Sequence, residues 1–264
     1  MNEPTSSPGD ASGEAVPPAT SVWSRMFNVF AAPDDVFAEV KASPRAMANW
    51  LLPALLLVLI GWAGAWLVAR DPVLQQQQRE IQDRALARMA AKQQWSEQQL
   101  EEVRRRAEAH QALGTGIGVF GVPLVSAVVA TFWWAWVLWL VGAKGLRGSF
   151  DYGKALEAAG LVAMIEVLNK ILTPLLQLAL GTVFAAPGLA LAVAGEFQAG
   201  DPLHLVLASV NGLDLWGIVV SAIAVARLSG ASFARSLAWL LAIWIPWKAV
   251  LIGVSLLTAR LFGG

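Results

Sequence analysis

Polar side chains interrupt three long apolar stretches of this sequence, and they are the residues best placed to do chemistry. Glu166, Asn169 and Lys170 follow one another at positions i, i+3 and i+4, which is one stripe of a helix. Asp214 and Lys248 stand inside two later apolar stretches. A charge at the centre of a bilayer costs ~2.5–3.5 kcal/mol on insertion scales. Because the four charges sum to zero, we expect these five side chains to form a neutral polar cluster within a membrane.

Two roles suit such a cluster. It can join helices structurally, at about 1 kcal/mol for each contact, or it can form a polar track for a proton, an ion or a lipid headgroup. Counted from the expected helix ends, Glu166, Asp214 and Lys248 each lie about twelve residues, or ~18 Å, deep. This common level predicts that Lys248 pairs with Asp214 or Glu166 and that Lys170 completes the cluster. The residue types alone slightly favour the structural role.

The familiar catalytic and metal-binding patterns are missing from the sequence. It has no cysteine and two histidines, and it contains no HExxH, no GxSxG and no Gly-rich phosphate loop. Asp214 is the one aspartate well inside an apolar stretch, so the paired aspartates of an intramembrane protease are not available. We therefore expect no enzymatic activity, metal or cofactor. The net charge of zero also argues against a nucleic-acid partner.

The composition indicates that these residues lie in a membrane. Of the 264 residues, 56% are hydrophobic and 14% are charged, whereas an ordinary soluble domain has about 25% charged residues. A helix of about 20 apolar residues crosses a bilayer. The sequence predicts an all-α, polytopic bundle with its membrane domain at 45–264. The five expected spans cover about 50–69, 117–143, 155–186, 203–226 and 237–262.

Two polar segments precede the first span. Residues 1–20 are rich in Pro, Ser and Gly and are typical of a disordered tail. Residues 21–44 predict short helices, the second with Asp34 or Asp35 as its N-cap. These helices either lie in the membrane interface or pack on the bundle. The first has an apolar face made by Trp23, Met26, Phe27 and Phe30.

A charged helical hairpin is expected at 71–113. Fifteen of the 38 charged residues fall between Arg70 and Glu108, among residue types that favour helices. Ser96 and Gln99 have the spacing of a capping box at the start of the second helix. The hairpin is either a solvated spacer, which we favour, or a partner-binding element. Tryptophans such as Trp133, Trp134 and Trp244, near the ends of spans, predict an aromatic belt.

The basic residues predict the orientation of the chain. Lys and Arg near span ends favour the cytoplasmic side. They precede the first span and follow the second and fourth, as Arg25, Lys41, Arg45, Lys144, Arg147, Lys154, Arg227 and Arg235. With five spans, this places the N-terminus in the cytoplasm, and it places the hairpin and the C-terminus outside. The expected location is the plasma membrane, in a bacterium the inner membrane.

The order of these parts resembles the Yip (Ypt-interacting-protein) domain family in its bacterial branch. The resemblance runs from about Val22 to the end and rests on FAAPDDVFAEVKASP, WLLPALL, GSFDYGKALEAAGLVAMIEVL and the LDLWGIVVSAIAVARLSGASFARSLAWLLAIW stretch. It implies a five-span bundle with a cytoplasmic N-terminus and no enzymatic activity. Eukaryotic relatives act in vesicle trafficking and contact Rab-type GTPases through an Asp-Leu-Tyr-Gly-Pro motif. The nearest segment here is PDDVF at Pro33–Phe37, so we do not expect a GTPase partner.

Together these features predict a non-enzymatic, Yip-like integral membrane protein with a scaffold or membrane-organising role. The alternative is a small transporter or lipid-moving protein that uses the intramembrane charges. The expected partners are membrane lipid and either a second copy of the chain or another membrane protein. A groove that reaches Glu166 or Lys248 would favour transport, whereas a dry and tightly packed cluster would favour a scaffold.

Overall fold

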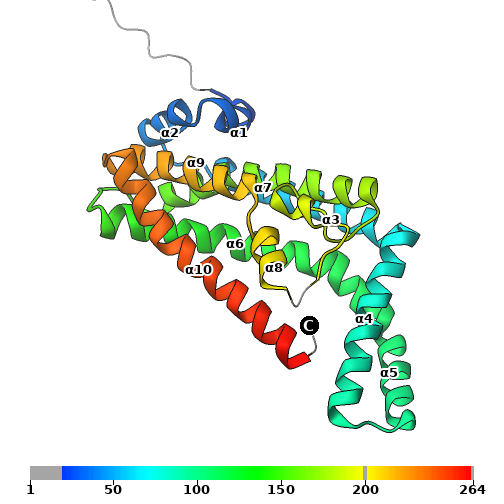
Figure 1. Cartoon of the computed structure of the whole chain (residues 1–264). Helices are drawn as coiled ribbons and strands as arrows, with labels where there is room; N and C mark the ends of the chain where they lie inside the picture. The colour runs from blue at the N-terminus through cyan, green and yellow to red at the C-terminus, as the bar shows by residue number, and fades with distance from the viewer. Residues whose placement is uncertain (1–19, 199–200, 263–264) are drawn as a thin grey trace, which may run out of the picture.

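The computed structural model describes residues 20–198 and 201–262, and nearly all of this part of the chain is helical (Figure 1). The tail expected at residues 1–20 lies, as far as residue 19, outside the part of the chain that the structure describes. The helices are α1 (Val22–Ala31), α2 (Pro33–Ala42), α3 (Ala48–Arg70), α4 (Pro72–Gln93), α5 (Glu97–Gly116), α6 (Val122–Trp139), α7 (Tyr152–Leu180), α8 (Pro202–Ser209), α9 (Gly212–Ser229) and α10 (Phe233–Phe262). Shorter helical turns are η1 (Ile117–Gly121), η2 (Leu140–Gly145) and η3 (Leu189–Ala192).

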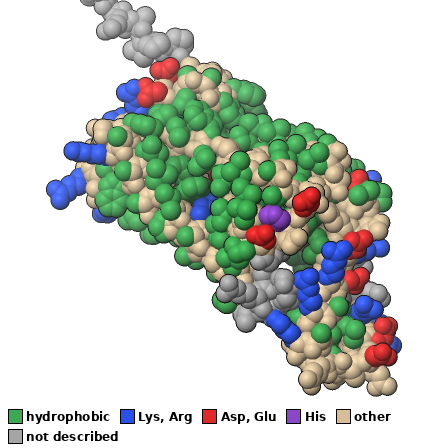
Figure 2. Space-filling view, in the orientation of Figure 1, with side chains coloured by type: hydrophobic (Ala, Val, Ile, Leu, Met, Phe, Trp, Pro, Cys, Tyr) green, Lys and Arg blue, Asp and Glu red, His purple; other side chains and the backbone are tan. Residues whose placement is uncertain are grey.

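Five helices of the described chain are long and apolar enough to cross a membrane, which confirms the predicted all-α, five-span bundle. They are Ala48–Arg70, Ile117–Gly145, Tyr152–Leu180, Gly212–Ser229 and Phe233–Thr258. Figure 2 shows hydrophobic side chains over most of the visible face of the bundle. Many of the charged side chains in that view gather at the upper left end and on the projecting α4–α5 segment. The apolar surface is therefore the part of the molecule that suits hydrocarbon.

The fourth span differs from its expected form. The apolar stretch at 203–226 is not one helix, because Val210 and Asn211 separate α8 from α9. The side chain of Asn211 caps α9 by accepting a hydrogen bond from the Leu213 amide at 2.8 Å. The Leu189 amide donates to the Val210 carbonyl at 3.2 Å. These partners satisfy backbone groups that a break within a membrane would otherwise leave exposed.

The third span also ends earlier than expected. Helix α7 stops at Leu180 rather than at 186, because Gly181 takes a left-handed conformation with φ of 61°. The Gln177 side chain then donates to the Val183 carbonyl at 2.9 Å. From Gly181 to Gln198 the described chain is irregular apart from the short η3. This irregular segment positions the break between α8 and α9.

Helices α3 and α7 form the centre of the bundle. Their closest approach is at Gly160, where an added Cβ would lie 2.2 Å from the Trp50 Cα and 2.7 Å from the Asn49 carbonyl oxygen. Small residues allow backbones of membrane helices to come this close. On the other side of the contact, Gly64 of α3 faces Pro174 of α7. The α3–α7 pair is therefore a rigid support for the helices around it.

Helices α1 and α2 cap the bundle at the end where α3 begins (Figure 1). Met26 and Val29 of α1 and Phe37 of α2 are fully or almost fully buried against it. Trp23 and Phe27 of α1 stay 54% and 67% exposed. The expected apolar face of α1 is thus divided, with one part packed on the bundle and the other part free to meet the interface. Below, we name this end of the molecule the α1–α2 end.

Helices α4 and α5 project from the opposite end of the molecule (Figure 1). The capping box at the start of α5 is confirmed: the Ser96 amide donates to Gln99 Oε1 at 2.9 Å, and the Gln99 amide donates to Ser96 Oγ at 3.3 Å. Helix α5 continues through η1 into α6 and η2. The second span is therefore the inner part of one long helical run that begins at Glu97.

Candidate functional site within the membrane

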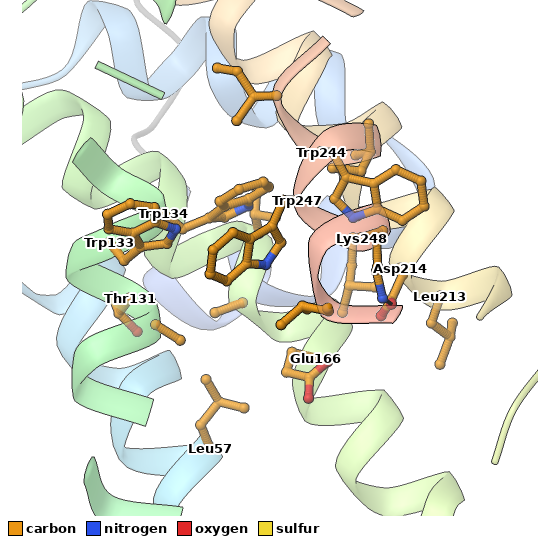
Figure 3. Close-up of a pocket in the computed structure, with 18 of the residues that line it drawn as sticks. Leu57, Thr131, Trp133, Trp134, Glu166, Leu213, Asp214, Trp244, Trp247 and Lys248 are labelled. Carbon is orange, nitrogen blue, oxygen red and sulfur yellow. Dashed lines mark hydrogen bonds and ion pairs between the residues drawn. The ribbon is translucent and has the colours of Figure 1, made fainter. Parts of the chain in front are cut away.

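A groove of about 590 Å³ lies between α6, α7, α9 and α10, with Leu57 of α3 also lining it (Figure 3). It is partly open. Most of its lining is apolar, but Thr131, Glu166, Asp214 and Lys248 contribute polar groups. All four contributing helices are among the membrane-spanning ones. We call it the intramembrane groove.

The ion pair between Lys248 and Asp214 lies on the wall of the groove. The Lys248 Nζ atom is 2.7 Å from Asp214 Oδ2, and it also approaches the Ser209 carbonyl at 3.4 Å. The ring of Trp244 is 5.4 Å from the same ammonium, within cation–π range. Lys248 thus joins α10 to both sides of the break between α8 and α9. Asp214 or Glu166 was the predicted partner of Lys248, and the structure shows Asp214.

Glu166, Asn169 and Lys170 form a second polar group on α7. Lys170 Nζ is 3.4 Å from Glu166 Oε1, and the Asn169 side chain donates to Glu166 Oε2 at 3.0 Å. Asn211 donates to Asn169 Oδ1 at 3.0 Å, which links this group to the start of α9. Lys170 is not among the residues that line the groove. The expected single cluster is therefore two separate ion pairs, and the hydrogen bond between Asn169 and Asn211 joins the α7 pair to the start of the helix that carries Asp214.

The polar groups occupy one level of the bundle. Glu166 follows the start of α7 by about 14 residues, and Lys248 follows the start of α10 by about 15, so each lies ~21–23 Å along its helix. Asp214 precedes the end of α9 by about 15 residues, which gives a similar depth. All three distances are measured from the α1–α2 end of the molecule. Glu166 and Lys248 therefore lie near the middle of their helices, and Asp214 lies at the same level in the first turn of α9, next to the break.

Four tryptophans line the groove, which the sequence did not predict. Trp133 and Trp134 come from α6, and Trp244 and Trp247 come from α10; the centroids of the Trp133 and Trp247 rings are 6.3 Å apart (Figure 3). Three of them, Trp133, Trp134 and Trp244, were expected in an aromatic belt near the span ends. Proximity to a span end gives the height of a side chain but not the direction in which it points. In the structure these four indoles line the intramembrane groove.

Helix α10 leaves the groove open on one side. In the apolar stretch of α10 that would cross the membrane, 6% of the residues are buried, whereas the share is 33–44% in the other four spans. Pro246 lies inside α10 beside the groove, and beyond it Val250, Val254 and Leu257 are more than half exposed. Figure 1 shows this half of α10 extending away from the other spans. The groove is thus accessible from the surface that faces hydrocarbon.

A second polar cluster, which sequence reasoning missed, lies at the α1–α2 end. Glu157 is 2% exposed and accepts a hydrogen bond from Asn49 at 2.7 Å, while Lys154 Nζ lies 3.1 Å from its other oxygen. Arg25 donates to Asn49 at 3.4 Å and pairs with Glu39 at 2.7 Å. We call these five residues the buried end cluster. It ties α1 and α2 to α3 and α7.

Two acidic groups of α2 have shifted ionisation at this end. Burial alone would raise the pKa of Glu39, but hydrogen bonds from Arg25 and Thr20 outweigh it, and the pKa lies below its ordinary value. A hydrogen bond from Arg227 lowers the pKa of Asp34. Asp34 or Asp35 was expected to be the N-cap of this helix, and that prediction is wrong, because α2 begins at Pro33 without any side-chain cap. The Asp34 carboxylate binds Arg227 of α9 instead.

The fold and the site together define an all-helical, five-span membrane protein with a partly open polar groove. The chain matches the family described as Yip1 domain, and the match covers residues 27–257. The chain therefore belongs to the Yip1 family, which confirms the family of the predicted resemblance. No curated protein and no solved structure matched the chain.

Proposed function

We propose that this Yip1-family protein binds membrane phospholipid in the intramembrane groove and lets the headgroup move between the two leaflets. The observation that supports this proposal is a groove that reaches Glu166 and Lys248 near the middle of two spans and Asp214 at the break before α9. A groove at these residues favours the lipid-moving alternative over a purely structural scaffold. The proposal involves no chemical step.

The exposure of the polar groups supports a ligand there. At the groove, the side chain of Glu166 is 41% exposed, and those of Asp214 and Lys248 are about a quarter exposed. Charged groups inside a membrane avoid hydrocarbon and face either protein or a polar cavity. A phospholipid headgroup would cover these groups, while its acyl chains remain against the apolar rim. The apolar residues beside Lys248, such as Val250 and Leu251, suit those chains.

We place the protein in the plasma membrane, and in the bacterial inner membrane if it belongs to the bacterial branch of the family. The N-terminus is proposed to be cytoplasmic and the C-terminus extracytoplasmic. Basic residues gather at the α1–α2 end, where Arg25, Arg45, Lys154 and Arg227 each form an ion pair. Such residues favour the cytoplasmic side.

A scaffold role is the second candidate. The observation that favours it is the α4–α5 segment, which leaves the bundle and carries exposed charged residues such as Arg84 and Glu102. Its partner would be a second copy of the chain or another membrane protein. This role requires the projecting segment but not the groove, so the two proposals can be separated by a change confined to the groove.

The test blocks the groove in purified protein reconstituted into vesicles. The vesicles contain a trace of phospholipid with a fluorophore on its acyl chain, and added dithionite bleaches the outer leaflet. We expect bleaching of the inner-leaflet pool as well when the wild-type protein is present. Gly217 lines the groove and has open space at its Cβ position. We expect Gly217→Trp to slow bleaching of the inner pool by about tenfold or more.

Gly253 supplies the matched control. It lies in α10, also has open space at its Cβ position, and does not line the groove. Gly253→Trp should bleach at the wild-type rate. If wild-type protein leaves the inner pool protected, or if Gly217→Trp and Gly253→Trp behave alike, the groove does not carry lipid and the scaffold role gains support.

A further inference from the structure

We propose that the intramembrane groove selects zwitterionic phospholipids whose headgroup carries an ammonium group, such as phosphatidylethanolamine, over anionic ones. This inference rests on the proposed function and names the lipid class that the same groove takes. Three features support it: the charge balance of Glu166, Lys170, Asp214 and Lys248, the N–H donors of Lys248, and the indole rings that lie across the groove from Glu166.

The charge balance favours a net-neutral headgroup. The groove is lined by two acids, Glu166 and Asp214, and by one base, Lys248. Lys170 lies behind Glu166 at 3.4 Å and brings the sum to zero. A zwitterionic headgroup leaves this sum at zero, whereas a headgroup such as phosphatidylglycerol adds an unbalanced negative charge beside two carboxylates. Like charges at close range in a poorly solvated site repel strongly.

Lys248 is placed to bind the phosphate that every glycerophospholipid carries. An ammonium has three N–H donors. Within residues 20–198 and 201–262, its hydrogen bonds are to Asp214 at 2.7 Å and to the Ser209 carbonyl at 3.4 Å. The third donor is available for a phosphate oxygen, and phosphates accept charge-assisted hydrogen bonds well. This contact fixes the headgroup in the groove but does not distinguish one lipid class from another.

Glu166 and the indole rings supply the contact that discriminates. The Glu166 carboxylate has room for about four hydrogen bonds, and its described partners are Asn169 and Lys170, both on α7. Trp133 and Trp247 stand on the opposite side of the groove (Figure 3). The faces of indole rings attract ammonium groups, most strongly where water is excluded. A lipid ammonium between these rings and Glu166 gains both contacts, and an anionic headgroup gains neither.

The test compares two tail-labelled lipids in identical vesicles that contain the full chain. One is phosphatidylethanolamine and the other is phosphatidylglycerol, each with the fluorophore on an acyl chain so that the headgroup is intact. The measured quantity is the ratio of their inner-leaflet bleaching rates. We expect phosphatidylethanolamine to move about tenfold faster with the wild-type protein. Glu166→Gln should bring the ratio to within about twofold of one.

Glu196→Gln is the matched control, because Glu196 is exposed in a turn outside the groove. It should keep the wild-type ratio. Equal rates for the two lipids with wild-type protein would overturn the inference while leaving lipid movement established. A ratio that Glu166→Gln leaves unchanged would overturn the role given to this carboxylate. Protection of both lipids would instead contradict the proposed function itself, and the wild-type ratio decides the inference even if the variant is unstable.

Discussion

The ion pair between Lys248 and Asp214 is the main polar link between α10 and the bundle, and a double-mutant cycle measures its strength. The two charged atoms are 2.7 Å apart, and both side chains are about a quarter exposed. Removing one partner of a buried pair costs ~3–5 kcal/mol, because the other charge is left unpaired. Partial exposure lowers this cost, so we expect Asp214→Asn and Lys248→Met each to reduce the free energy of unfolding by about 2–3 kcal/mol.

The double variant leaves no unpaired charge and should cost no more than either single variant. The expected coupling energy is therefore about 2–3 kcal/mol, within the range measured for close charge pairs. The assay is unfolding of purified protein in mixed micelles, followed by tryptophan fluorescence. The exposed pair of Glu80 and Arg84 on α4 is the control cycle, with an expected coupling below about 0.5 kcal/mol. Additivity within ~0.5 kcal/mol at Asp214 and Lys248 would refute the link.

Three further predictions concern other parts of the molecule. Gly160→Leu should abolish a stable fold or lower the melting temperature sharply, since its side chain would meet the α3 backbone; Gly253→Leu, at an open position, should not. The pKa values of Asp34 and Glu39 are lowered, so their stabilisation is present above pH ~4 and is lost as the pH falls further; hydrogen exchange in α1 and α2 should then increase while exchange in α3 stays slow. A cytoplasm-dependent reporter should be active after Gly148 and silent after Gly264, and activity at both positions would contradict the proposed orientation.

Much of the fold was predictable because it depends on local properties of the chain. Hydropathy over about 20 residues identifies a span whatever surrounds it, and the capping box joins Ser96 and Gln99, which are three residues apart. The predicted cap at Asp34 failed for the opposite reason. That carboxylate binds Arg227, which is 193 residues away in the sequence, and no local pattern contains this information.

The candidate site was predictable only in part. The rise per residue of a helix was enough to place Asp214 and Lys248 at one level. The groove depends instead on how each helix is rotated and on the break before α9, and neither follows from hydropathy. The buried end cluster was missed because Asn49 and Glu157 lie near span ends, where polar residues are ordinary. One signal was available: Arg25 stands directly beside Met26, on a helix whose apolar side is buried.

The two polar clusters of the bundle show why the groove, rather than charge alone, indicates a function. The buried end cluster joins helices in a packed environment, where Glu157 is 2% exposed and contacts both Asn49 and Lys154. Polar residues that served only to join α7, α9 and α10 would be expected in a similar environment. The side chains of Glu166, Asp214 and Lys248 at the groove are instead between about a quarter and 41% exposed, among helices that span the membrane, where exposure to hydrocarbon is costly. The groove beside them exists because α10 extends away from the other spans, and a ligand with a polar head and apolar chains matches both the polar and the apolar surfaces of that groove.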